Sequence, residues 1–186
     1  MKAGTGADVG LSPSSYAVFL RAVNVGTHNR VRMAAVSEAV GGLGYENVRT
    51  YLATGNIALT STEPAEVVGG RIEEALAGLG LKGVDAMVRT RGELAALDGT
   101  AFEPYAPGEY RHLAIFTRQP VEIADDLPFA VRGVTVVGVG ATVLAVIPRE
   151  AARPVNANAV VEAVWQTRST TRWWNVVEDF RRDVLT

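Results

Sequence analysis

The chain alternates between short apolar runs and stretches in which apolar residues recur every third or fourth position. The apolar run 16–23 predicts a buried strand, and the helical spacing over 33–43 predicts a helix that ends before Gly44. Two further runs, 47–53 and 56–60, surround the hairpin signal Thr54-Gly55. A helix with an apolar face over 68–79 and a strand over 84–89 complete the series. This β-α-β-β-α-β order is the ferredoxin-like, split β-α-β pattern.

The second half repeats this theme less clearly. Runs at 111–118, 134–139 and 142–147 predict strands, and helical spacing predicts helices near 158–165 and from 170 or 171 onward. We therefore expect an α+β fold with two subdomains. The expected division is a flexible N-terminal tail over 1–14, a ferredoxin-like α+β subdomain over 15–98, and a looser α+β subdomain with C-terminal helices over 99–186.

Composition narrows the classes of function. The 186 residues carry a formal net charge of −2, with a pI of about 5.7, and a strong nucleic-acid binder is usually basic. Nucleic acid is therefore a conceivable partner that the net charge does not favour. There is no cysteine, which excludes a disulfide and a thiolate metal ligand. No apolar run reaches the roughly 18 residues of a membrane span, and the first residues lack the apolar stretch of a signal peptide. We expect a cytoplasmic protein without membrane contact.

The predicted topology brings two distant segments together. In a split β-α-β unit, the end of the first strand and the hairpin between the second and third strands lie at one sheet edge, so 24–32 should lie near 54–56. Helix N-termini attract anions, and Arg30 and Arg32 stand just before the first helix. This favours a phosphate, a carboxylate or an acidic protein patch as partner. Alternatively, the two arginines are solvated or paired with Glu38, and Asn24 and Gly26 only build the turn.

Arg21 poses a separate question because it lies within the first apolar strand, on the face of Phe19 and Val23. A buried charge needs a partner. We expect an acidic residue or a carbonyl group from the second half, and a ligand is the alternative.

The segment TTRWWN, over 170–175, places two tryptophans beside an arginine. Such a pair can stack bases, although tryptophans at a helix start more often anchor the helix to the core. We expect Trp173 to pack in the core, whereas the position of Trp174 stays open.

Three segments, YAVFLRAVNVG with NRVRM, LGYENVRTYLATGNI and TTRWWNVV, carry a family resemblance. The chain resembles the domain-of-unknown-function 1697 family, in the right order over about 16–180. The resemblance implies a two-subdomain α+β fold and no assigned activity. It also leads us to expect that the three segments meet around one cleft between the subdomains.

The chain departs from the pattern of that family at several positions. Ala22 and Thr27 stand where the family favours glycine, and Ala53-Thr54 replaces glutamine-serine in the hairpin. Trp173 and Val176 replace asparagine and threonine. Because the changes in the hairpin and at Trp173 remove polar groups from the expected site, they favour binding or structure over a fixed reaction mechanism.

No HExxH, P-loop, GxGxxG or GxSxG motif occurs. His28 could act as a base but lacks a carboxylate at suggestive spacing, and His112 opens a strand. We therefore lean against an enzyme, and predict no catalytic residue, metal or cofactor. The best interpretation is a binding module for a small anionic ligand or nucleotide at the edge or cleft near 24–32 and 54–56. Alternatives are an enzyme acting on a phosphorylated small molecule, or a protein-interaction or structural domain. The sequence does not indicate the oligomeric state. The candidate ligand-binding residues are Arg21, Asn24, Gly26, Asn29, Arg30, Arg32, Thr54, Gly55, Asn56, Arg172, Trp174 and Asn175.

Overall fold

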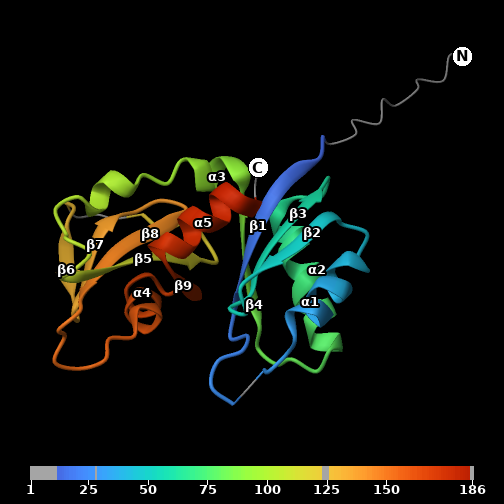
Figure 1. Ribbon diagram of the computed structural model, residues 1–186, viewed down its shortest axis with the longest axis horizontal. Helices are drawn as coiled ribbons and strands as arrows, with labels where there is room; N and C mark the ends of the chain where they lie inside the picture. Colours follow the sequence, from blue (N-terminus) through green and yellow to red (C-terminus); the bar gives the residue numbers. More distant parts are fainter. Residues whose placement is uncertain (1–11, 28, 123–125, 185–186) are drawn as a thin grey trace, which may run out of the picture.

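The computed structural model describes residues 12–27, 29–122 and 126–184 (Figure 1). Most of the predicted N-terminal tail, residues 1–11, and the candidate base His28 lie outside the described residues. Within the described ranges, no helix is long and apolar enough to cross a membrane.

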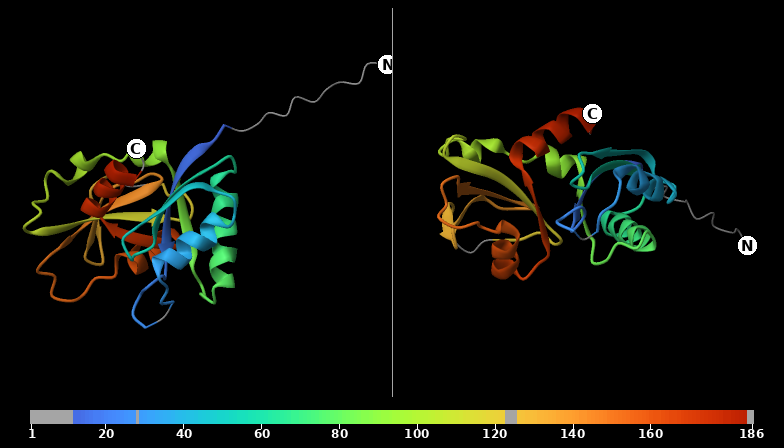
Figure 2. Two further views of the ribbon diagram at one scale, coloured as in Figure 1. Left: turned by 45° about the vertical axis from the view of Figure 1, so that its right-hand side comes forward. Right: turned by 60° about the horizontal axis from the view of Figure 1, so that its bottom comes forward.

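The first half forms a four-stranded sheet with strand order β2-β3-β1-β4, and its strand pairs are antiparallel. Helices α1 and α2 lie on the face turned away from the second sheet (Figures 1 and 2). This arrangement confirms the predicted split β-α-β order. Its elements are β1 (Ser14–Arg21), α1 (Met33–Gly41), β2 (Glu46–Tyr51), β3 (Asn56–Ser61), α2 (Ala65–Gly78) and β4 (Asp85–Thr90).

The second half contains a five-stranded sheet with the order β6-β7-β8-β5-β9, and its strand pairs are also antiparallel. Two antiparallel sheets with both helices and strands make this an α+β fold with two subdomains, as predicted. The predicted division between 98 and 99 falls between α3 and η1. The remaining elements are α3 (Arg91–Ala95), η1 (Gly99–Phe102), β5 (Tyr110–Thr117), β6 (Phe129–Val131), β7 (Val134–Gly138), β8 (Thr142–Pro148), α4 (Ala157–Trp165), β9 (Ser169–Trp173) and α5 (Trp174–Val184).

Strand β9 corrects the sequence interpretation of 170–175. A helix was expected from Thr170 or Thr171, but the chain stays extended and pairs with β5 until Trp173. β-Branched threonines fit a pleated strand better than a helix, and pairing with a distant strand supplies their hydrogen bonds. The expectation that Trp173 packs in the core is therefore wrong, because its side chain is 49% exposed at the sheet edge. Trp174 is buried instead and packs against Gly99 and Phe102.

The two sheets face each other across an apolar layer. Phe19 of β1 stacks on Phe116 of β5 with ring centroids 3.7 Å apart, and Phe180 of α5 meets Phe19 edge-on. On the far face of the second sheet, α4 covers a separate core (Figure 1). The layer between the sheets also includes α3 through Leu94, and it joins the two halves through a continuous buried contact.

Arg89 crosses this layer from the first half to the second. It lies on β4, is 5% exposed, and donates hydrogen bonds to the carbonyl oxygens of Thr117 (2.6 Å) and Ala141 (2.8 Å). Burial lowers the pKa of Arg89. The carbonyl dipoles satisfy its donors, so this charge holds strand ends of the second sheet against β4.

Candidate functional site

Arg172 joins all three segments that carry the family resemblance. It lies on β9 and is 7% exposed. Its Nε donates to Oδ1 of Asn56 at 2.5 Å, and its Nη2 donates to the carbonyl oxygens of Leu20 and Thr54, both at 2.8 Å. The expectation that these segments meet is therefore confirmed through Arg172. Asn175 lies exposed on α5.

The guanidinium of Arg172 donates its hydrogen bonds to neutral groups. The acceptors of its hydrogen bonds are carbonyl, amide and hydroxyl oxygens, including Oγ1 of Thr170 at 2.8 Å. Burial lowers the pKa of Arg172 to about 10, so the guanidinium stays protonated at neutral pH. None of the described carboxylates pairs with Arg172, and a buried cation of this kind exerts its field in surroundings that screen it weakly.

Arg21 has the partner that its place in an apolar strand predicted. Its Nε lies 3.1 Å from Oε1 of Glu162 on α4 and donates to the Ser169 carbonyl oxygen, also at 3.1 Å. Both partners belong to the second half. Arg21 is thus an ionic clamp between the halves, and part of its charge is neutralised.

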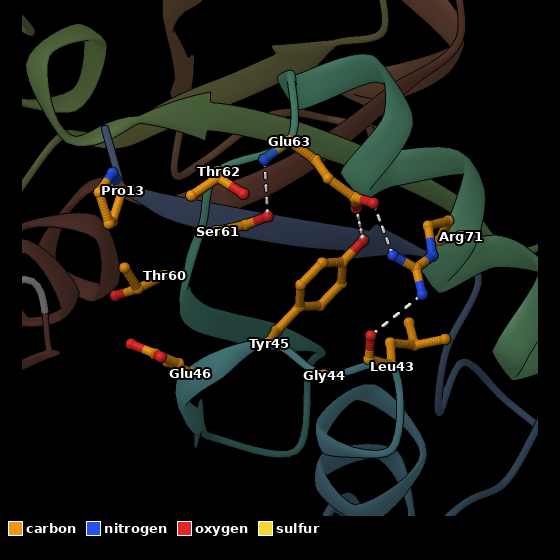
Figure 3. Close-up of a pocket in the computed structure, with 10 residues that line it drawn as sticks. All are labelled: Pro13, Leu43, Gly44, Tyr45, Glu46, Thr60, Ser61, Thr62, Glu63 and Arg71. Atoms are coloured by element: carbon orange, nitrogen blue, oxygen red, sulfur yellow. Dashed lines mark hydrogen bonds and ion pairs between the residues drawn. The ribbon is translucent and has the colours of Figure 1, made fainter. Parts of the chain in front are cut away.

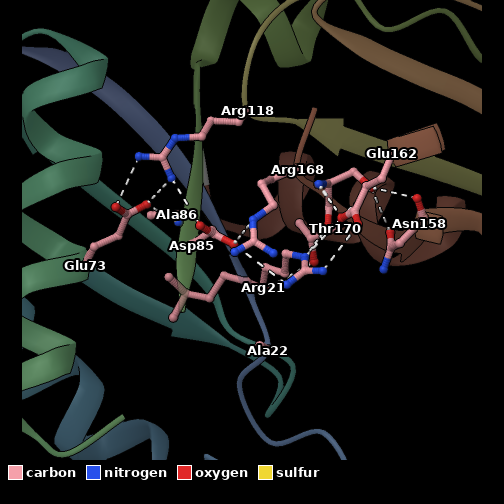
Figure 4. Close-up of polar contacts among 12 residues, drawn as sticks. Arg21, Ala22, Glu73, Asp85, Ala86, Arg118, Asn158, Glu162, Arg168 and Thr170 are labelled. Carbon is pink, nitrogen blue, oxygen red and sulfur yellow. Dashed lines mark hydrogen bonds and ion pairs between the residues drawn. The ribbon is translucent and has the colours of Figure 1, made fainter. Parts of the chain in front are cut away.

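Asp85 extends that clamp into a network of charged residues from both halves (Figure 4). Its carboxylate lies 3.8 Å from Arg21, 3.5 Å from Arg168 and 3.4 Å from Arg118. Arg118 also pairs with Glu73 at 2.6 Å. Opposite charges alternate through this network, which therefore contributes to holding the halves in one relative position.

Two asparagines shape the loop after β1. Asn24 exchanges hydrogen bonds with the backbone of Val31 (2.9 and 3.1 Å) and donates to the carbonyl oxygen of Ala53 at 2.9 Å. Asn29 donates to the carbonyl oxygens of Ala22 (2.8 Å) and Lys82 (2.7 Å). These contacts confirm that the loop lies beside the β2–β3 hairpin, and they give both asparagines a structural role.

The side chains of the two arginines expected to attract an anion are exposed and take no part in the contacts of Asn24 and Asn29. Arg30 is exposed and donates from Nε to the carbonyl oxygen of Gly26 at 3.1 Å. Arg32 is exposed at the position before α1 and makes no side-chain capping bond. Neither residue lines the cleft described next.

A cleft of about 680 Å³ opens where the end of β1, the following loop and the hairpin face the second sheet. Its opposite side comes from β5, β8, β9 and the first turn of α4. Of the sequence candidates it takes in Arg21, Asn24, Thr54 and Arg172. Further polar or aromatic side chains on its lining are Arg111, Asn156, Asn158, Thr170, Thr171 and Trp173.

The charged side chains on this lining are all arginines. Within the described ranges the lining holds Arg21, Arg111 and Arg172 and no carboxylate. Arg111 is exposed, and its guanidinium lies over the indole of Trp173, 5.9 Å from the ring centroid. Sequence reasoning missed Arg111 because an arginine that opens a strand carries no local signal. It also missed Trp173 as a cleft residue because it assigned that position to a helix.

Three residues on the cleft lining hold left-handed backbone conformations without being glycine. Their φ values are 62° at Ala22, 53° at Asn24 and 59° at Leu52. Such conformations are unfavourable for alanine and leucine, and they cluster at ligand sites. The value at Ala22 also gives a physical reason for the glycine that the resembled family favours there.

A second, smaller hollow of about 190 Å³ lies at the other end of the first sheet (Figure 3). Glu63 there accepts hydrogen bonds from the Tyr45 hydroxyl at 2.8 Å and from Arg71 at 2.6 Å. Burial, and next the bond to Glu63, raise the pKa of Tyr45 to about 12. The donors and acceptors of this group satisfy one another, so it connects α2 with the loop before β2.

Stacking and a hydrogen bond to the backbone hold His112 in place. His112 stacks on Phe102 with centroids 4.6 Å apart, and its Nε2 lies 2.7 Å from the Tyr105 carbonyl oxygen, which makes it structural. Among the described residues, no group of three or more metal-ligating side chains occurs.

Comparisons with known proteins agree with the resemblance found in the sequence. The model of a family described as protein of unknown function (DUF1697) matches residues 14–129, which is more than half of the chain. No curated protein matches. A solved structure of a conserved bacterial protein from Streptococcus pneumoniae is similar, with a TM-score of 0.61 and 18% sequence identity. The similarity covers 92% of this chain and 98% of that one, and it supports the fold.

Proposed function

We propose that this chain, which belongs to the DUF1697 family of proteins of unknown function, is a binding module for a small anionic ligand. The proposed site is the cleft between the two sheets. The observation that carries the proposal is its charge: arginines from β1, β5 and β9 line it, and within the described ranges no carboxylate does.

The three arginines contribute unequally to this field. Arg21 is paired with Glu162, so its charge is largely met within the protein. Arg111 lies over Trp173 and has no carboxylate partner among the described residues, and Arg172 is buried among neutral acceptors. The net attraction for an anion therefore comes from Arg111 and Arg172.

The cleft also presents donors that suit anion oxygens. Oδ1 of Asn158 accepts a hydrogen bond from the Thr171 hydroxyl at 2.6 Å, which leaves the amide Nδ2 of Asn158 to donate. Asn156 is the N-cap of α4, and its side-chain oxygen accepts a hydrogen bond from the backbone amide of Ala159. The backbone amides of Ala157 and Asn158, which precede Ala159, stand at the positive end of the helix. Arginine side chains, amide side chains and backbone N–H groups are donors that bind anions. We therefore propose that the cleft binds a ligand, and we propose no reaction there.

The proposal places the ligand deeper than the sequence-based prediction did. Arg30 and Arg32 lie outside the cleft, so they serve as controls instead of ligands. We propose no nucleic-acid partner, in line with the net charge of −2. A cytoplasmic location also stays a prediction.

A thermal-shift screen with small phosphates and carboxylates tests this proposal. A ligand that binds only the folded chain raises its melting temperature by mass action. We expect at least one class of anion to stabilise the wild-type chain and the Arg30→Ala control, but to have little effect on Arg111→Ala. Each variant removes one exposed arginine, so the main difference between them is that Arg111 lines the cleft and Arg30 does not. Absence of any stabilising anion, or an effect lost in Arg30→Ala and kept in Arg111→Ala, would overturn the proposal.

A further inference from the structure

We infer that the anion is a mononucleotide, whose base stacks on Trp173 and whose phosphate lies among the donors of the cleft. This inference rests on the proposed function and adds the class of ligand. It starts from the aromatic and apolar part of the lining, which a bare phosphate would leave uncovered.

Trp173 stands at an open position on an edge strand. Side chains alternate along β9, so Thr171 and Trp173 point to the face that α4 covers, while Thr170 and Arg172 point toward the first sheet. The indole is 49% exposed, and the guanidinium of Arg111 lies over it. Nucleobases stack on tryptophan rings and on arginine planes, so this pair forms a platform for a base.

Two more exposed apolar side chains line the same cleft. Val25, in the loop after β1, is 65% exposed, and Leu52, in the hairpin, is 51% exposed. Together with Trp173 they are the three most exposed large apolar residues of the described chain. A flat base covered by these three side chains would remove apolar surface from water, which an anion without an aromatic part cannot do.

The polar donors stand at a suitable spacing from this platform. Thr171, whose hydroxyl holds Asn158, precedes Trp173 by two residues on β9, a rise of about 7 Å along a strand. That separation is of the order of the distance between the base and the phosphate of one nucleotide. The cleft volume of about 680 Å³ also lies within the range of small-molecule sites, roughly 300–1,000 Å³.

Calorimetric titration of the full chain with nucleotides and their parts tests the inference. The probes are AMP, GMP, CMP and UMP, with ribose 5-phosphate and adenosine as the two halves of one ligand. We expect at least one mononucleotide to bind tenfold or more tightly than either half. Trp173→Ala should weaken the binding of that nucleotide by about tenfold or more. It should leave the affinity for ribose 5-phosphate unchanged, because only the base stacks on the indole. Trp173→Phe, which keeps a ring, should recover part of the loss.

Each other outcome has a distinct meaning. If ribose 5-phosphate binds as tightly as the nucleotide, the inference fails while the proposed anion site stands. If no probe binds and the anion screen is also negative, both fail. If a thymidine oligonucleotide binds more tightly than any mononucleotide, with a steep decrease as salt increases, the ligand is single-stranded nucleic acid and the inference is overturned.

Discussion

The guanidinium Nε of Arg172 lies 2.5 Å from the amide Oδ1 of Asn56, although 116 residues separate them in the chain. Asn56 is fully buried, and its Nδ2 donates to the Tyr51 carbonyl oxygen at 2.9 Å, so it cannot turn away from the arginine without losing a second bond. This contact fixes β9 against the β2–β3 hairpin. The cleft is therefore formed by two surfaces held at a set distance.

Removing this contact should destabilise the whole chain. Arg172→Ala leaves Oδ1 of Asn56 and the carbonyl oxygen of Thr54 without the donor that Arg172 supplies, and each such buried group costs about 1–3 kcal/mol. We expect the free energy of unfolding to decrease by about 3 kcal/mol or more in urea titrations. Arg172→Lys keeps the charge but not the planar fork, so its loss should be intermediate. A decrease below about 1 kcal/mol for Arg172→Ala would contradict the structural role.

Gly55 allows the hairpin to approach β1. Its φ is +80°, and a Cβ there would lie 2.9 Å from the Cβ of Leu20. Gly26 has a φ of +59° but nothing within 4 Å of a Cβ, which makes it a matched control for the backbone effect. Gly26→Ala should cost about 1 kcal/mol, and Gly55→Ala clearly more, in the same denaturation experiment. Equal effects would show that the close approach to Leu20 is unimportant.

Asp85 should matter more than an ordinary surface carboxylate. Its side chain is 15% exposed, it faces three arginines, and its Oδ2 is buried without a hydrogen bond. We expect Asp85→Asn to lower the free energy of unfolding by about 2 kcal/mol, because the arginines keep their charge and lose their shared partner. Asp179→Asn, which removes an exposed pair with Arg182, should change it by less than about 0.5 kcal/mol. Similar values for both would argue against the network as a clamp.

Tyr45 predicts a specific dependence of stability on alkaline pH. Because its pKa is raised from 10.0 to about 12, the folded chain favours the neutral phenol. Its contribution to stability is complete below about pH 10 and is lost as the pH increases toward 12. The free energy of unfolding should therefore decrease less steeply across this interval in Tyr45→Phe than in the wild-type chain. Identical slopes would show that Tyr45 titrates normally.

The first half was predicted well because its helices, strands and hairpin are each indicated by residues that are close together in the sequence. Apolar periodicity gave α1 and the strands around it, and Thr54-Gly55 marked the hairpin, so the sheet edge could be located from topology. Arg21 shows the limit of such reasoning. A charge in an apolar strand demands a partner, but nothing in the sequence identifies Glu162, which lies 141 residues away.

The second half was predicted less well because long-range pairing decides its structure. Threonines followed by Trp173, Val177 and Phe180 at helical spacing predict a helix start. The hydrogen bonds that β5 offers instead extend β9 through Trp173, and α5 begins one residue later. This shift exposes Trp173, which was expected in the core, and buries Trp174, whose position the sequence left open. It also moves the candidate site from the loop arginines to the cleft.

NMR titration of the ¹⁵N-labelled chain tests directly whether the ligand binds in the cleft. Side-chain N–H signals are followed while the mononucleotide that binds most tightly is added. We predict that the indole N–H of Trp173, the side-chain amide of Asn158 and the Nε–H of Arg111 shift as the ligand saturates. The signals of Arg30, Arg32 and the buried Trp174 should change little. Shifts confined to Arg30 and Arg32, with Trp173 and Arg111 unmoved, would place the ligand at the loop edge and contradict a binding cleft between the two sheets.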